Sequence, residues 1–524
     1  MARSRAFGWW VAIALGALLA TGCSSSGNNR SSGNGGSTAP TAGTSFAVRL
    51  PVITRPPVAG KGIDRPQPAP PLPSGYVEDE FFVSGTATSF TAGKTPDNGF
   101  WTATTGATAK YRTRVIVRRP PANKFSGTVI VEWFNVSAVE ADPDWAYLSQ
   151  EIGREGDAYI GVSAQAQGVE GGKTILNVNV NQKTASSLGE SADKSGLKHI
   201  DPARYGTLVH PGDAYSYDIF SQVGKAAAAS PGLLLGGLQP KKVLAVGESQ
   251  SAAFLTTYVD AVHPLDPVFD GFLIHSRGAG GAPLDGKISA GRSASITTGG
   301  LLIRTDIHVP VFMFETETDL TLLGYSHARQ PDSKFVHTWE VAGTSHADAH
   351  LLQVVVGGPP HDPKVGSLLG CTAPINTGPQ PEVLQAALHQ FVAWASGGAP
   401  PPTGTRLQLA KPSGKEASIA RDAHGNALGG VRNPLVDVPI ATLTGEPPSG
   451  TTAADLAKST GTCILFGRTI PFAHSELVSL YGTADKYVAA FRSSADQEVA
   501  AGFLLRPDAD ALVAYAESNR GLFT

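Results

Sequence analysis

The chain of 524 residues has little charge, and several protein classes are excluded by what it lacks. Only 16% of its residues are charged, and 41 basic against 44 acidic side chains leave a formal net charge of −3. This balance argues against a nucleic-acid partner, which would require a basic surface. An apolar content of 41% argues against a disordered chain, and 60 glycines with 38 prolines argue against a helical bundle.

Long apolar runs are absent beyond the N-terminus, so the sequence predicts no spanning helix in the body of the chain. The apolar run Ala6–Ala20 follows Arg3 and Arg5 and has the length of a secretory signal. It leads to Cys23 and resembles a bacterial lipoprotein signal, although Ala20 replaces the usual leucine. We therefore expect removal of residues 1–22 and export, with lipidation of Cys23 as the membrane anchor; plain secretion is the alternative.

The segment 23–75 is rich in serine and glycine and then in proline, and it has few residues that can build a core. Such a composition predicts a flexible tether, whose proline-rich part is expected as extended chain laid over the surface of the domain. Globular patterning begins near Tyr76. The sequence thus predicts one extended domain over 76–524, with its core at about 76–400 and a C-terminal extension at about 401–524.

Cysteine is scarce, with three in the chain, and there is no CxxC or Cys/His cluster of the kind that binds structural zinc. If Cys23 carries lipid, Cys371 and Cys463 remain, 92 residues apart. In an exported protein they are expected to form a disulfide. Two buried free thiols are the alternative.

Short apolar runs alternate with helical patterns along the body of the chain. Such alternation predicts an α/β architecture, in which a mostly parallel sheet has helices on both faces and places functional residues at the carboxyl ends of its strands. The expected strands are 111–118, 127–134, 158–164, 242–246, 269–275, 309–314 and 335–341, and the expected helices are 142–154, 213–229, 250–262 and 383–395.

One strand end carries a nucleophile pattern. The expected strand 242–246 runs into the sequence GESQS, and a helix follows at once. A sharp strand–turn–helix exposes its central serine, and it requires small residues two positions before and after it, here Gly247 and Ser251. The pattern predicts Ser249 as a nucleophile. An ordinary strand–helix turn with a serine is the alternative.

A base and an acid follow in the chain order typical of such sites, serine, then acid, then histidine. His346 lies in a glycine-bearing loop after the last strand and is the expected base. Asp319, nine residues after Pro310, is the expected acid. Glu317 is the alternative, because the sequence alone does not separate the two.

Two backbone N–H groups are needed to stabilise the oxyanion of a tetrahedral intermediate. The residue after the nucleophile, Gln250, is expected to supply one of them. The loop after the strand 127–134 is expected to supply the other, from Asn135 or Val136. A side-chain turn cap is the alternative role of Asn135.

Several motifs resemble the large bacterial "α/β hydrolase domain" proteins, which are serine esterases of the α/β-hydrolase superfamily. The resemblance implies a single extended α/β-hydrolase domain with Ser249 and His346 in the catalytic triad, and it leaves the acid open. The resembling stretches are VEWFNVS (131–137), HPGDAYSYDIFSQ (210–222), VGESQSA (246–252), DGFLIHSRGAGGAP (270–283), VAGTSH (341–346), CTAPINTGPQ (371–380) and DAHGNALGGVRNPLVDVPIA (422–441).

The leading hypothesis is a serine hydrolase that cleaves small carboxylic esters through an acyl-enzyme, with no cofactor and no metal. Its expected partner is the ester, with contact to a membrane only through the lipid anchor. A catalytically degenerate hydrolase fold, kept as a binding lipoprotein of the cell envelope, is the alternative. A metal-dependent hydrolase that uses His346, Asp348 and His350 is a third and weaker hypothesis.

Overall fold

The computed structural model describes residues 46–172, 196–286, 300–371, 373–411, 417–446 and 463–524. The expected signal (1–22), Cys23 and the tether as far as residue 45 lie outside the described residues. Within the described part of the chain, no helix combines the length and the apolar character needed to cross a membrane.

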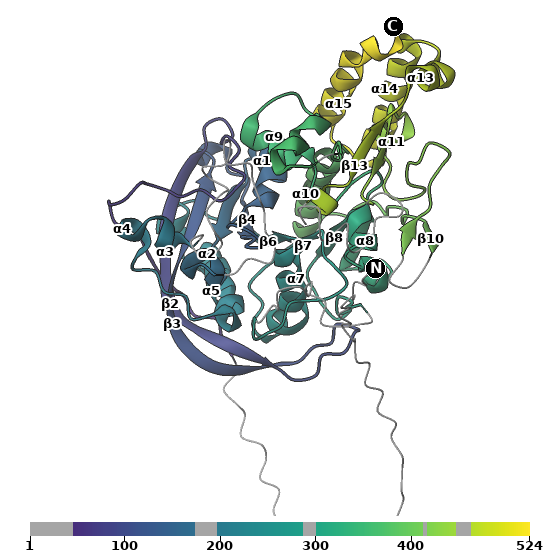
Figure 1. Cartoon of the computed structure of the whole chain (residues 1–524). Helices are drawn as coiled ribbons and strands as arrows, with labels where there is room; N and C mark the ends of the chain where they lie inside the picture. The colour runs from purple at the N-terminus through teal and green to yellow at the C-terminus, as the bar shows by residue number, and fades with distance from the viewer. Residues whose placement is uncertain (1–45, 173–195, 287–299, 372, 412–416, 447–462) are drawn as a thin grey trace, which may run out of the picture. The chain divides into compact units, whose positions relative to one another are not determined.

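Among the described residues, nine strands form one large sheet (Figure 1). The pairs β1–β2, β2–β3 and β3–β5 are antiparallel, whereas all pairs from β5 to β9 are parallel. The predicted mostly parallel sheet is thus confirmed. In sheet order the strands are β1 (Val52–Thr54), β2 (Val77–Ala92), β3 (Ala103–Arg119), β5 (Ala158–Val162), β4 (Thr128–Trp133), β6 (Lys242–Glu248), β7 (Gly271–His275), β8 (Val311–Glu315) and β9 (Val336–Glu340).

The central strands are buried because helices cover both of their faces. Every residue of β4, β5, β7, β8 and β9 is buried, as expected for a parallel sheet between two helical layers. In Figure 1, α1 (Pro143–Glu155) and α10 (Gln380–Ala395) lie on one side of the strands, and α5 (Ser216–Ala229) and α7 (Gln250–Thr257) lie on the other. Because the strands from β6 to β9 are parallel, the carboxyl ends of β6, β8 and β9 lie on the same side of the sheet.

Shorter helices connect these elements or follow the strands. They are α2 (Ala166–Glu170), α3 (Leu197–Ile200), α4 (Pro202–Tyr205), α6 (Pro231–Leu234), α8 (Glu317–Thr321), α9 (Ala349–Val356) and α11 (Pro434–Asp437). Of these, α8 follows β8 directly and α9 follows the loop after β9, so both lie near the carboxyl ends of these strands.

The long ribbon of β2 and β3 was only partly predicted. The sequence indicated a strand at 111–118, whereas β3 begins at Ala103 and pairs along its length with β2, which was not predicted. The far half of the ribbon alternates small polar residues such as threonine and serine, and much of it is exposed. This part of the ribbon is stabilised by pairing between β2 and β3 rather than by burial of an apolar run.

The domain begins earlier than the sequence indicated. The tether was expected to reach residue 75 with its proline-rich part laid over the domain, and the structure places all of residues 46–75 against the domain as part of one unit with it. Val48 is buried, β1 pairs with β2, and the backbone N–H of Asp64 donates to the hydroxyl of Tyr205 at 2.9 Å. A proline-rich chain has few N–H donors, and several of those in this segment bond to β2, to side chains of the domain or to a backbone carbonyl.

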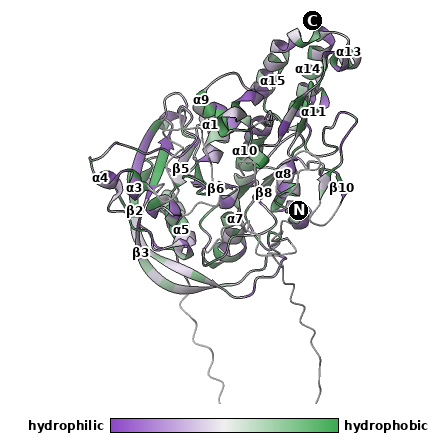
Figure 2. Ribbon diagram, in the orientation of Figure 1, coloured by the Kyte–Doolittle hydropathy of each residue, from purple (hydrophilic) through white to green (hydrophobic). Residues whose placement is uncertain are grey.

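The C-terminal extension adds two small antiparallel sheets and a group of helices. Figure 2 shows hydrophilic and hydrophobic residues alternating along α14 and α15, as expected for helices with one buried face. A disulfide joins Cys371 to Cys463, with 5.7 Å between their Cα atoms, and so links two distant segments. The elements are β10 (Leu409–Lys411), β11 (Ser418–Ile419), β12 (Ala441–Thr444), β13 (Arg468–Pro471), α13 (His474–Tyr481), α14 (Ala484–Ala501) and α15 (Arg506–Ser518).

Candidate active site

Ser249 stands at the sharp turn between β6 and α7. Its φ of 59° and ψ of −115° lie in a region that costs a non-glycine residue on the order of 1–3 kcal/mol. A Cβ atom added to Gly247 would lie 3.1 Å from the Cβ of Ser251, so the turn does bring these two positions together. The N–H of Ser249 donates to the carbonyl of His275 at the end of β7, at 3.0 Å, and anchors the turn.

His346 links Ser249 to Asp319. The loop after β9 places the Nε2 atom of His346 2.8 Å from the Oγ of Ser249. Its Nδ1 atom lies 2.7 Å from Oδ1 of Asp319. All three side chains come from loops or helix starts at the carboxyl ends of β6, β8 and β9, and the imidazole is buried. The structure therefore brings together the predicted serine, histidine and Asp319.

Asp319 rather than Glu317 reaches the histidine. The Oδ2 atom of Asp319 accepts hydrogen bonds from the N–H and the hydroxyl of Thr316, each at 2.7 Å, which fixes the carboxylate at the start of α8. Glu317 points elsewhere: it accepts from the N–H of Gly343 at 2.7 Å and pairs with Arg421 at 2.8 Å. Helical residues that are two positions apart in the sequence point in directions about 200° apart, so only one of the two carboxylates can reach His346.

A third carboxylate, missed by the sequence analysis, lies beside the histidine. The Oε1 atom of Glu248 is 3.4 Å from the Nε2 atom of His346. Burial raises the pKa of Glu248 to about 7, although His346 and His275 oppose the shift. Burial also lowers the pKa of His346, but the carboxylates of Glu248 and Asp319 more than offset this, so its pKa ends above the usual 6.5. The available signal was a charged residue ending an apolar strand.

The candidate oxyanion donors are held differently. Gln250 begins α7, and the first N–H groups of a helix have no acceptor within it. The N–H of Asn135 donates to the carbonyl of Ala141 at 2.9 Å and is already engaged. The N–H of Val136 donates to the side-chain Oε1 of Gln250 at 3.2 Å, which is a partner that can move aside.

The residues of the metal hypothesis, His346, Asp348 and His350, have other partners. Asp348 accepts from the hydroxyl of Tyr147 at 3.0 Å and from the N–H of His350 at 2.9 Å, and so caps α9. The Nε2 atom of His350 lies 3.1 Å from the carbonyl oxygen of Ala146. These contacts explain the two residues without a metal ion.

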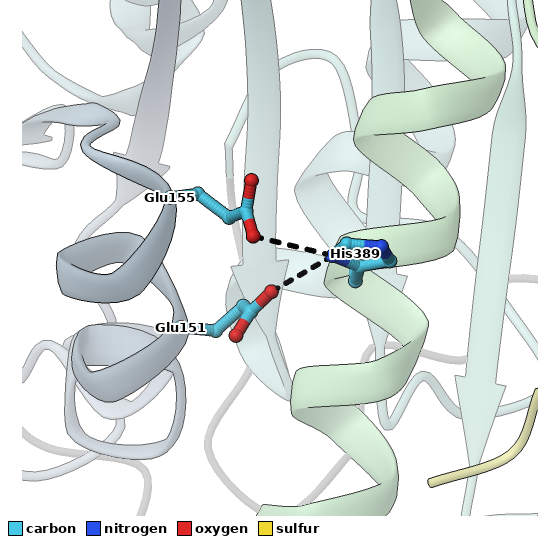
Figure 3. Close-up of side chains that lie close together, drawn as sticks. All are labelled: Glu151, Glu155 and His389. Carbon is cyan, nitrogen blue, oxygen red and sulfur yellow. Dashed lines mark hydrogen bonds and ion pairs between the residues drawn. The ribbon is translucent and has the colours of Figure 1, made fainter. Parts of the chain in front are cut away.

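Within the described part of the chain, one other group has side chains that could hold a cation. Glu151 and Glu155 of α1 face His389 of α10, and their ligand atoms lie within 4.8 Å of one another (Figure 3). However, Nε of Arg154 donates to Glu151 at 2.6 Å. This guanidinium already neutralises the most buried carboxylate of the group and opposes a bound cation.

Comparison with known proteins gives matches of two kinds. No curated protein matches the chain. Among solved structures, esterase Est22 is 13% identical, with 62% of this chain and 82% of that one covered and a TM-score of 0.29. A thermostable esterase from Pseudomonas putida is 12% identical, with 56% and 81% covered and a TM-score of 0.26. Acetyl xylan esterase 1 from a Thermoanaerobacterium species is 11% identical, with 49% and 81% covered and a TM-score of 0.24.

Similarity this low carries no argument about activity. A family model covers far more of the chain, because it matches residues 52–514, from β1 into α15. That range includes the strand–turn–helix at Ser249 and the loops of Asp319 and His346. The chain therefore belongs to the family described as the alpha/beta hydrolase domain.

Proposed function

We propose that this protein is a serine esterase that cleaves small carboxylic esters through an acyl-enzyme. The observation that carries the proposal is the unbroken chain of hydrogen bonds from Ser249 through His346 to Asp319, at 2.8 and 2.7 Å. Strain at the serine supports a catalytic role, because non-glycine residues held in such a conformation cluster at active sites. Membership of a hydrolase family supports the same reaction class.

Ser249, His346 and Asp319 have different roles in the proposed reaction. The Oγ of Ser249 attacks the acyl carbon while Nε2 of His346 accepts its proton, and a C–O bond forms. As the tetrahedral intermediate collapses, the bond to the leaving alcohol breaks and His346 protonates that oxygen. Water then attacks the acyl-enzyme with His346 as base, the bond between the acyl carbon and the Oγ of Ser249 breaks, and His346 returns the proton to Oγ as the acid is released. Asp319 keeps the proton of the neutral imidazole on Nδ1 throughout.

The oxyanion is assigned to the N–H groups of Gln250 and Val136. The Asn135 alternative is set aside because its N–H already donates to Ala141. The carbonyl oxygen of the bound ester, which becomes the oxyanion when Ser249 attacks, replaces the side-chain oxygen of Gln250 as the acceptor for the N–H of Val136. Each donor of this kind is typically worth about 3 kcal/mol of transition-state stabilisation.

The test combines a covalent probe with substrates. We expect a fluorophosphonate to label the mature protein at Ser249, as read by peptide mass spectrometry. Nitrophenyl esters of increasing acyl length should be hydrolysed with an initial burst if the acyl-enzyme accumulates. A protein that is folded but neither labelled nor active across the series would refute the proposal and favour the binding lipoprotein.

We further propose that the protein is exported and anchored through lipid on Cys23. The disulfide between Cys371 and Cys463 supports an oxidising compartment. Expression of the full chain in bacteria should place it in the membrane fraction with a diacylated N-terminal cysteine. Cys23→Ser should lose the lipid and leave that fraction. An unmodified Cys23 on an exported, soluble protein would instead establish plain secretion.

A further inference from the structure

Glu248 occupies a position that the triad mechanism leaves unexplained. It ends β6 directly before Ser249, and its carboxylate is buried. Oε1 lies 3.4 Å from Nε2 of His346, the same nitrogen that bonds the nucleophile. His346 is thus placed between two carboxylates, Asp319 at Nδ1 and Glu248 near Nε2.

Asn135 holds the carboxylate of Glu248 in this orientation. Its side-chain Nδ2 donates at 3.2 Å both to Oε2 and to the backbone carbonyl of Glu248. Asn135 is itself fixed, because it exchanges two backbone hydrogen bonds with Ala141, at 2.9 and 2.8 Å. Oε1 is therefore left directed toward His346, and Asn135 gains a role other than oxyanion binding.

We propose that Glu248 is a positioning residue that acts through His346 and stabilises the imidazolium formed when Ser249 gives up its proton. The proposal rests on the proposed esterase function. A negative charge this close to a buried imidazole favours the protonated ring, because burial weakens the screening by water. Asp319 supplies the same effect from the other nitrogen, so the base has two counter-charges instead of one.

The protonation of Glu248 makes this support depend on pH. The charged and titratable groups that face Glu248 are His346, His275, Asp144, Asp319 and Tyr147. With its pKa raised to about 7, Glu248 is ionised above that pH and supports the imidazolium. Below it, Glu248 and His346 compete for protons as a coupled pair, and the support is lost. Glutamine at this position keeps the shape but never carries the charge.

The decisive experiment is a titration of His346 followed by NMR of its labelled Cε1 position, assigned by the signal lost in His346→Gln. In Glu248→Gln we expect the pKa of His346 to fall by at least about one unit, a tenfold loss of proton affinity. The acid limb of kcat/KM should move to lower pH by the same amount. A merely structural role would lower activity equally at every pH and would not move the histidine signal.

A matched control is available at His361. The Oε1 atom of Glu382 lies 3.3 Å from its Nε2, and both groups are largely buried. Glu382→Gln should shift the titration of His361 and leave that of His346 in place. Asn135→Ala, which frees the carboxylate but keeps its charge, should lower the pKa of His346 by a smaller amount than Glu248→Gln.

The outcomes separate this proposal from the esterase assignment. An unchanged titration of His346, within about 0.3 unit, in a folded Glu248→Gln protein overturns the role of Glu248 even if esters are hydrolysed. If Glu248→Gln does not fold, an unchanged titration in Asn135→Ala overturns it. A shifted titration in a protein that neither hydrolyses esters nor reacts with the phosphonate supports the electrostatic coupling and refutes the esterase.

Discussion

In the described part of the chain, His346 and His389 each contact two carboxylates, and only His346 belongs to the candidate active site. His346 is 2.7 Å from Asp319 and 3.4 Å from Glu248. His389 is 3.0 Å from Glu151 and 3.6 Å from Glu155. The distances are similar, but the carboxylates approach both ring nitrogens of His346, whereas both approach Nδ1 of His389. Burial differs, because the side chain of His346 is 5% exposed and that of His389 is 42% exposed.

The difference follows from where the two groups stand. His346 lies in a loop at the carboxyl end of the sheet, with a strained serine at its second nitrogen. His389 lies on α10 and faces Glu151 and Glu155 of α1 (Figure 3), and its side chain is partly exposed to water. Charges about 4 Å apart interact by about 1 kcal/mol in water but several times more where water is excluded. Proximity of a histidine to acids is thus insufficient; burial and a third group make a site.

The largest effect on turnover is expected at Ser249, which contacts His346 and has no counterpart beside His389 in the described part of the chain. Ser249→Ala should reduce ester turnover by about 10⁶-fold, because it removes the nucleophile. Ser251→Ala, a buried serine two residues away, is the matched control and should stay within about threefold. Initial rates and far-UV circular dichroism of both variants check this. Turnover above one hundredth of wild type in Ser249→Ala would contradict the assignment.

The next effect separates two acids of one loop. Asp319→Asn should lower turnover by about 10⁴-fold with little change in thermal unfolding, because the imidazole loses its orienting partner. Glu317→Gln should keep turnover within about tenfold, or ~1.4 kcal/mol in the barrier. It should instead reduce the free energy of unfolding by roughly 1.5–3 kcal/mol, since Arg421 loses a charged hydrogen-bond partner. The reverse ranking in turnover would transfer the role to Glu317.

A smaller, pH-dependent effect is expected at Asp157, which is influenced by Glu151, Glu155 and His389. Burial raises its pKa from 3.8 to about 7, so the folded state binds the proton more tightly. The stability this contributes is complete below pH 3.8 and is lost as pH rises to about 7. Urea unfolding should therefore show that the free energy of unfolding of Asp157→Asn, relative to wild type, increases by roughly 2–3 kcal/mol from pH 5 to pH 8. An equal difference at both values would disprove the shift.

The smallest effect is expected at the second histidine. His389→Ala should leave ester turnover within about twofold and change the free energy of unfolding by at most about 1 kcal/mol, because the imidazole is 42% exposed and water screens its ion pairs. His346→Ala is the contrasting variant and should lose nearly all turnover. A large loss of turnover in His389→Ala, restored by an added divalent cation, would show that the group around His389 takes part in activity.

The sequence by itself determined the features that depend on local patterns. The strand–turn–helix at Ser249 is readable because an apolar run, two small residues and a helical segment follow one another without interruption. The position of His346 after the last strand follows from the order of the same elements. The central strands were predicted because both of their faces are buried, which makes their sequences rich in apolar residues.

Tertiary structure alone decided the choices between neighbouring residues. Asp319 and Glu317 are both carboxylates, and only the start of α8 turns one toward His346 and the other toward Arg421. In the same way, the partner of each N–H group separates Val136 from Asn135. Glu248 and β2 were missed because a carboxylate and a polar ribbon gain their meaning from groups far away in the chain. Patterns in a sequence record periodicity and order, whereas direction and burial arise only when distant segments pack.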